Sequence, residues 1–92
     1  GGIPIRVRGI DAAEIQGQCD RESKVAIVAR DWLRTRLAST TTIELVDVDL
    51  EEDRYGRAVA RVMLDGQDLA TEMVSKRLAA PWIPGSRTDW CQ

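Results

Sequence analysis

Apolar and charged residues alternate at the start of the chain, where residues 3–10 read IPIRVRGI. Such an alternation is typical of a β-strand, because successive side chains of a strand point to opposite faces. The two faces would hold Ile3, Ile5 and Val7 on one side, and Arg6, Arg8 and Ile10 on the other. The pattern therefore predicts a first strand over residues 3–10.

Apolar residues recur at helical spacing in the next segment. They form a stripe that consists of Val25, Ala29, Leu33 and Leu37, with Ala26 and Trp32 beside it. Asp20 precedes this stripe, and aspartate is a favoured N-cap because its carboxylate accepts a hydrogen bond from a free backbone N–H. The spacing predicts a helix over residues 21–37 that begins after Asp20 and packs its stripe on a flat surface.

The later segments predict two more strands and a second helix. Residues 41–48 are rich in β-branched side chains, and residues 58–64 lead into an Asp-Gly turn, which are both strand signals. A helix fits residues 68–77, with Asp68 as its N-cap. Residues 79–92 are predicted to form an irregular tail that is anchored by its tryptophans. Strands joined by turns and interrupted by helices favour an α+β fold, as a small barrel with helices packed around it.

Length and charge narrow the class of protein. The 92 residues are enough for one small domain over residues 1–92. A net charge of -2 excludes a protein that binds nucleic acid through overall positive charge alone, so any phosphate binding has to be local. No apolar run approaches the roughly 18 residues that a membrane span needs, and we expect no membrane partner.

The chain contains no histidine. A Ser/His/Asp triad, a Cys/His pair and a His-containing zinc site are therefore excluded within it. Carboxylates and arginines, alone or with a metal ion, remain as candidate functional groups.

Cys19 and Cys91 are too few for a zinc site built from cysteines alone, which leaves one disulfide or two free thiols. We favour the disulfide, which would hold the C-terminal tail near the start of the first helix. It would also indicate an oxidising compartment, and therefore a secreted or periplasmic protein.

Two short motifs carry the candidate chemistry. Arg6, Asp11 and Glu14 form the pattern R-x-x-x-x-D-x-x-E, and residues 53–57 read DRYGR. Together with the following strand, the Asp-Gly turn and a helix ending in LAAPW, they resemble the staphylococcal nuclease, or thermonuclease-like, family from about residue 3 to residue 82. The C-terminal half also looks like the nuclease-like domain of rhizobial succinoglycan biosynthesis proteins.

The resemblance implies a five-stranded OB-fold barrel with packed helices and a calcium-dependent phosphodiesterase that cuts DNA and RNA. By this resemblance Arg6 and Arg57 would hold the phosphate, and Glu14 would be the general base or orient the attacking water. Asp11 and the backbone carbonyl of Ala12 would bind Ca²⁺. These residue types suit the chemistry, since guanidinium groups bind two phosphate oxygens at once and calcium prefers oxygen ligands.

Arg54, Tyr55 and Trp82 are further candidates for contacts with the substrate. Trp82 could stack on a base, but a tryptophan close to prolines is also able to pack against the barrel. Without the second motif, Asp11 and Glu14 would read as a simple turn. It is their occurrence with DRYGR that favours a functional site.

The chain departs from the family pattern at two places that bear on activity. Ala13 stands where the family usually has proline, which leaves the turn before Glu14 less rigid. The family's upstream D-G-D-T segment, with a further calcium-binding aspartate, has no counterpart before Gly1. We therefore expect a barrel without its N-terminal strands, which an upstream segment or a partner chain would complete, and little activity from this chain alone.

A second hypothesis belongs to another functional class. The chain could be a catalytically inactive module of the same fold that binds nucleic acid or supports exopolysaccharide (succinoglycan) biosynthesis. The arginines and Glu14 favour the enzyme, whereas the absent aspartate favours the inactive module.

Overall fold

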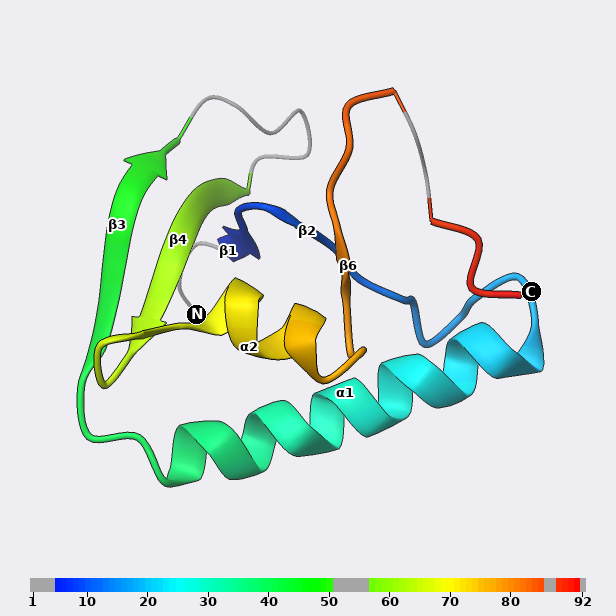
Figure 1. Cartoon of the computed structure of the whole chain (residues 1–92), viewed down its shortest axis with the longest axis horizontal. Coiled ribbons are helices and arrows are strands. Elements are labelled where there is room, and N and C mark those ends of the chain that lie inside the picture. Colours follow the sequence, from blue (N-terminus) through cyan, green and yellow to red (C-terminus); the bar gives the residue numbers. More distant parts are fainter. Residues whose placement is uncertain (1–4, 51–56, 86–87, 92) are drawn as a thin grey trace.

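The computed structural model describes residues 5–50, 57–85 and 88–91 (Figure 1). Its elements are β1 (Ile5–Val7), β2 (Ile10–Asp11), α1 (Asp20–Ala38), β3 (Ile43–Asp49), β4 (Ala58–Leu64), β5 (Gln67–Asp68), α2 (Leu69–Ser75) and β6 (Ala80–Pro81). The α+β class predicted from the sequence is confirmed. Arg54 and Tyr55 lie outside the described residues.

Strand β4 lies at the centre of the larger sheet, between β1 and β3. β1 runs parallel to β4, whereas β3 and the short β5 are antiparallel to it. The register of β3 against β4 shifts between Val46 and Asp49, where Asp47 has a φ of 53°. β2 and β6 form a separate antiparallel pair. Over the described residues the strands thus form open sheets, and the closed five-stranded barrel is not seen.

The prediction of one strand over residues 3–10 was wrong in its second half. β1 ends at Val7, and the chain turns at Gly9, whose φ of 92° suits a residue without a side chain. Because of this turn β2 joins the second sheet. Ile10 consequently lies in the core with 7% of its surface exposed, and not on the arginine face of the first strand.

The core lies between β4 and the two helices. Val62 and Leu64 alternate with Arg61 and Met63 along β4, and Leu64 is fully buried. The core cluster contains Ile10, Val62, Leu64, Leu69, Met73 and Ala79, with Ala29, Trp32 and Leu33 of α1 packed against it. Figure 1 shows α1 along one side of the molecule, with α2 between it and the strands. Of the predicted stripe, Ala29 and Leu33 pack against the core cluster, whereas Leu37 is exposed.

The observed ends of the two helices agree with the sequence prediction only in part. The N-cap of α1 is Cys19 and not Asp20, which is already in the first turn. The N-cap of α2 is confirmed, since the Asp68 carboxylate accepts a hydrogen bond from the backbone N–H of Ala70. Helix α2 ends before the predicted residue 77, where Arg77 takes a left-handed φ of 60°. No helix of the described residues is long and apolar enough to cross a membrane.

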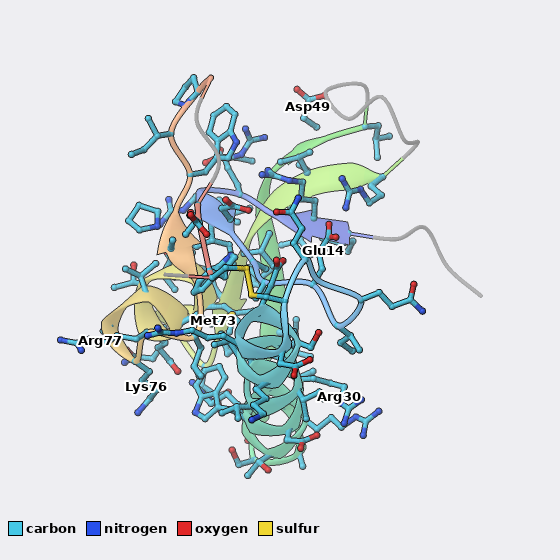
Figure 2. The ribbon with its side chains drawn as sticks, turned by 90° about the vertical axis from the view of Figure 1, so that its right-hand side faces the viewer. Glu14, Arg30, Asp49, Met73, Lys76 and Arg77 are labelled. Carbon is cyan, nitrogen blue, oxygen red and sulfur yellow. A yellow bond between two sulfur atoms is a disulfide. The ribbon has the colours of Figure 1, made fainter. Side chains whose placement is uncertain are left out.

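The C-terminal tail is held by a strand and by a disulfide. β6 pairs with β2, which the sequence did not predict. The expected disulfide between Cys19 and Cys91 is present, with their Cα atoms 6.0 Å apart, and Figure 2 shows it as a yellow bond. Trp82, by contrast, is 47% exposed and is no core anchor. The tail is therefore fixed close to the start of α1, as the disulfide prediction required.

Candidate functional site

A cavity of about 440 Å³ opens beside β1, between the sheet and the helices. Its lining comes from β1, from residues 10–14, from Arg57 at the start of β4, and from the apolar side chains Leu33, Leu69 and Met73. Its charged residues are Arg6, Asp11, Glu14 and Arg57. The structure thus brings Arg6, Asp11 and Glu14 of the first motif and Arg57 of the second to one cavity, where Ala12 also lies.

Arg6 is held at one side of this cavity. Its guanidinium Nη2 donates to the carbonyl oxygen of Ile10 at 3.3 Å, and its Cζ atom lies 5.7 Å from the ring centre of Trp82. Trp82 is positioned by its own backbone N–H, which donates to the carbonyl oxygen of Gly9 at 2.9 Å. The β2–β6 pairing therefore places an aromatic ring against Arg6. Trp82 is not among the residues that line the cavity, and its stacking on a base stays a prediction.

Asp11 is oriented by the C-terminal tail. Its Oδ2 atom accepts a hydrogen bond of 2.9 Å from the backbone N–H of Thr88. The same tail is joined to α1 three residues later through Cys91. A carboxylate held in this way loses rotational freedom, so the tail helps to preset the direction in which Asp11 faces the cavity.

Glu14 lies on the loop between β2 and α1. Figure 2 shows it above α1, on the side of the view away from Lys76 and Arg77. The backbone N–H of Glu14 donates to Oε2 of Glu22 at 3.1 Å. The loop is thereby tied to the first turn of α1, although Ala13 itself supplies no rigidity.

Arg57 lines the same cavity, although it lies far from Arg6, Asp11 and Glu14 in the sequence. It directly precedes Ala58, which is 4% exposed and pairs with Ile5 of β1. The parallel pairing of β1 with β4 thus places Arg57 next to the strand that carries Arg6. The other residues of this motif, Arg54 and Tyr55, cannot be placed because they lie outside the described residues.

Sequence reasoning missed two residues that support this site. Glu22 and Thr88 bind the backbone of Glu14 and the side chain of Asp11, respectively. Glu22 had one detectable signal, because it lies four positions before Ala26 and so extends the buried stripe of α1 by one turn. Thr88 had none, since its contact joins residues 77 positions apart.

The oxygen atoms that the described residues place around Asp11 do not fill the coordination sphere of a calcium ion. Calcium takes about six to eight oxygen ligands, whereas among the described residues only Asp11 and Glu14 line the cavity with carboxylates. Within residues 5–50, 57–85 and 88–91, no group of three or more His, Cys, Asp or Glu side chains could hold a metal ion. In the part of the chain that the structure describes, the oxygen donors are of the right chemical type for calcium but too few.

Comparison with known families gives one match. The model of the family described as staphylococcal nuclease homologue matches residues 4–86. This span contains every strand and helix of the structure and all the residues that line the cavity. Among curated proteins, no sequence matches the chain significantly.

Proposed function

The chain belongs to the family of staphylococcal nuclease homologues, and we propose that it hydrolyses phosphodiester bonds of DNA or RNA in a calcium-dependent reaction. The observation that supports this proposal is the lining of one cavity by Arg6, Arg57, Asp11 and Glu14. A phosphodiester is an anion, so two guanidinium groups beside a carboxylate base suit its hydrolysis.

In this mechanism Arg6 and Arg57 bind the non-bridging phosphate oxygens and stabilise the charge that develops on them. Glu14 accepts a proton from a water molecule, which attacks phosphorus on the side opposite the leaving oxygen. A new P–O bond forms as the bond to the leaving oxygen breaks, and that oxygen takes up a proton from solvent. Arg54, Tyr55 and Trp82 contact the nucleic acid next to the scissile bond.

Asp11 and the carbonyl of Ala12 are the proposed calcium ligands from this part of the chain. The remaining ligands would come from outside the described residues, because the carboxylates of the cavity do not fill the coordination sphere. We therefore expect calcium binding to depend on oxygen ligands in addition to Asp11 and Ala12.

Exposed apolar side chains on the larger sheet support a proposal about the complete fold. Four large apolar side chains on β1 and β3 are 41% to 57% exposed: Ile5, Ile43, Leu45 and Val48. Ile43 and Leu45 pair with Leu64 and Val62 of β4, so they lie on the core face of the sheet. We propose that further strands, from an upstream segment or a partner chain, pair with β3 on the side away from β4 and complete an OB-fold barrel.

The disulfide supports the proposed location. A bond between Cys19 and Cys91 is consistent with an oxidising compartment. We propose that residues 1–92 act as a single domain in a secreted or periplasmic protein.

The proposal is tested on the natural full-length chain that carries these residues. Cleavage of single-stranded DNA should depend on added calcium, and Arg57→Ala should lower kcat by at least about 100-fold, as for other preorganised charge stabilisers. Arg34→Ala is the matched control, because Arg34 is exposed on α1 and does not line the cavity. It should leave kcat within about twofold of the unchanged protein.

One outcome would replace the enzyme by the alternative hypothesis. If the full-length protein binds both calcium and DNA but cuts nothing, the chain is an inactive binding module of this family. A role in exopolysaccharide biosynthesis would then be the next function to test.

A further inference from the structure

Glu22 is the one charged side chain that is buried among the described residues, with 3% of its surface exposed. Its carboxylate faces the loop that carries Glu14. Oε2 accepts the backbone N–H of Glu14 and Oε1 accepts the backbone N–H of Gln18, both at 3.1 Å. Both carboxylate oxygens therefore bind the same loop, at two points four residues apart.

The loop closes tightly around this carboxylate. A Cβ atom added at Gly17 would lie 2.6 Å from both Cγ and Cδ of Glu22, which is closer than such atoms approach. Only a residue without a side chain fits at position 17 while Glu22 keeps its place. Since burial of a carboxylate is unfavourable unless it is hydrogen-bonded, the two N–H contacts and the close fit depend on one another.

We propose that Glu22 is a positioning residue, which fixes the backbone of Glu14 and so directs the Glu14 carboxylate into the cavity. The inference rests on the proposed function in one respect, namely that Glu14 acts on the attacking water. Ala13 restricts the backbone before Glu14 less than a proline would, and the backbone N–H of Glu14 itself is held by the carboxylate of Glu22. Rigidity in this loop thus comes from α1 and not from the loop's own sequence.

The test compares Glu22→Ala and Glu22→Gln with the unchanged full-length protein. Ser23→Ala is the control, because its hydroxyl donates to the carbonyl of Cys19, the N-cap of α1, and not to Glu14 or Gln18. Hydrogen exchange at the amides of Glu14 and Gln18 is followed by NMR, and kcat and KM for single-stranded DNA are measured at a temperature where every variant is folded.

In Glu22→Ala, exchange at both amides should accelerate roughly tenfold or more, and kcat should fall by a similar factor with KM within about twofold. Glu22→Gln should give a smaller change in both measurements, because its amide keeps one acceptor oxygen. Ser23→Ala should change neither. A loss confined to kcat, together with partial rescue by glutamine, is not expected of a residue that only stabilises the fold.

Two results would overturn the inference. One is unchanged exchange at Glu14 and Gln18 in Glu22→Ala. The other is faster exchange at these amides with unchanged kcat, which would show that the position of the Glu14 backbone does not affect catalysis. If the unchanged protein cuts nothing, the proposed function fails, and the exchange rates alone decide whether Glu22 fixes this loop.

Discussion

The two ends of helix α1 are held by different kinds of contact. At the N-terminal end, Glu22 binds the backbone of the Glu14 loop, and Cys19 is bonded to Cys91 of the tail. At the C-terminal end, the guanidinium of Arg36 donates to the carbonyl oxygen of Leu64 and to both carboxylate oxygens of Glu72. One end thus supports the cavity, and the other supports the core.

Apolar packing is distributed unequally between these ends. Trp32 and Leu33, in the second half of α1, pack against the core cluster, together with Ala29 near its middle. Glu22 and Ala26, the buried residues of α1, lie in its first half, but neither belongs to the core cluster. The site loop is therefore attached where the helix has little apolar contact, so its geometry depends on hydrogen bonds and on the disulfide. Changes at the C-terminal end should therefore alter stability without altering site geometry, whereas loss of the disulfide at the N-terminal end should alter both.

The largest effect on stability is expected from removal of the disulfide in the variant Cys19→Ser/Cys91→Ser. The bond joins residues 72 positions apart, and a closed loop of this length stabilises the folded state by about 4 kcal/mol, mainly by restricting the unfolded chain. Urea unfolding should show this loss in the free energy of unfolding. The hydrogen bond from Thr88 to Asp11 should also weaken, as seen in faster exchange of the Thr88 amide.

Reduction of the unchanged protein with a thiol reagent provides the control for this variant. It should lower the free energy of unfolding by the same amount. Equal urea midpoints for the variant and the oxidised protein would contradict the prediction that the tail is fixed by this bond.

A smaller loss is expected at the other end, from Leu64→Ala. Leu64 is fully buried and lies outside the cavity lining, so the cavity left behind should cost about 3 kcal/mol. Leu37→Ala is the matched control, because Leu37 is 39% exposed near the end of α1, and it should cost less than about 1 kcal/mol. In the folded protein Leu64→Ala should leave kcat unchanged. A large fall in kcat at full folding would show that core and site are not separable.

The elements that the sequence predicted correctly depend on local signals. The strand over residues 58–64 coincides with β4, and Asp68 caps α2 through an N–H only two residues away. The errors depend on distant contacts. The turn at Gly9 sends Ile10 to pair with Pro81 at β6, and nothing in residues 3–10 alone shows that this partner exists.

In the candidate site, too, short motifs could be read from the sequence, whereas contacts between distant residues could not. Two short motifs were enough to name Arg6, Asp11, Glu14 and Arg57, which the structure brings to one cavity, although their chemical roles stay predictions. The groups that hold them in place were not predicted. The position of Glu22 on the buried stripe of α1 is visible in the sequence, but its hydrogen bonds go to backbone amides of the loop, whose positions depend on the fold. Sequence thus indicated which residues gather, and the fold shows what fixes their positions.

The smallest effect is expected from Glu72→Gln, at the C-terminal end of α1. The hydrogen bonds from Arg36 lower the pKa of Glu72 below its ordinary value of 4.5, and those to Glu72 raise the pKa of Arg36. A carboxylate with a lowered pKa in the folded state stabilises the protein above its ordinary pKa, and this contribution is lost as the pH falls through the folded pKa. Because the side chains of the pair are partly exposed, Glu72→Gln should lower Tm by no more than a few degrees at pH 7.

This difference in Tm between Glu72→Gln and the unchanged protein should shrink as the pH falls through the folded pKa of Glu72, because protonation removes the charge that the glutamine also lacks. The backbone N–H groups of Thr42 and Thr41 also lower the pKa of Asp65, so both proteins lose stability in acid, but Asp65 is common to both and cancels in the difference. Thermal unfolding followed by circular dichroism from pH 7 to pH 2 measures it. A difference that does not shrink toward pH 2 would mean that Glu72 stabilises the protein through its shape and not through its charge. Arg36 would then hold this end of α1 mainly through its hydrogen bond to the carbonyl oxygen of Leu64.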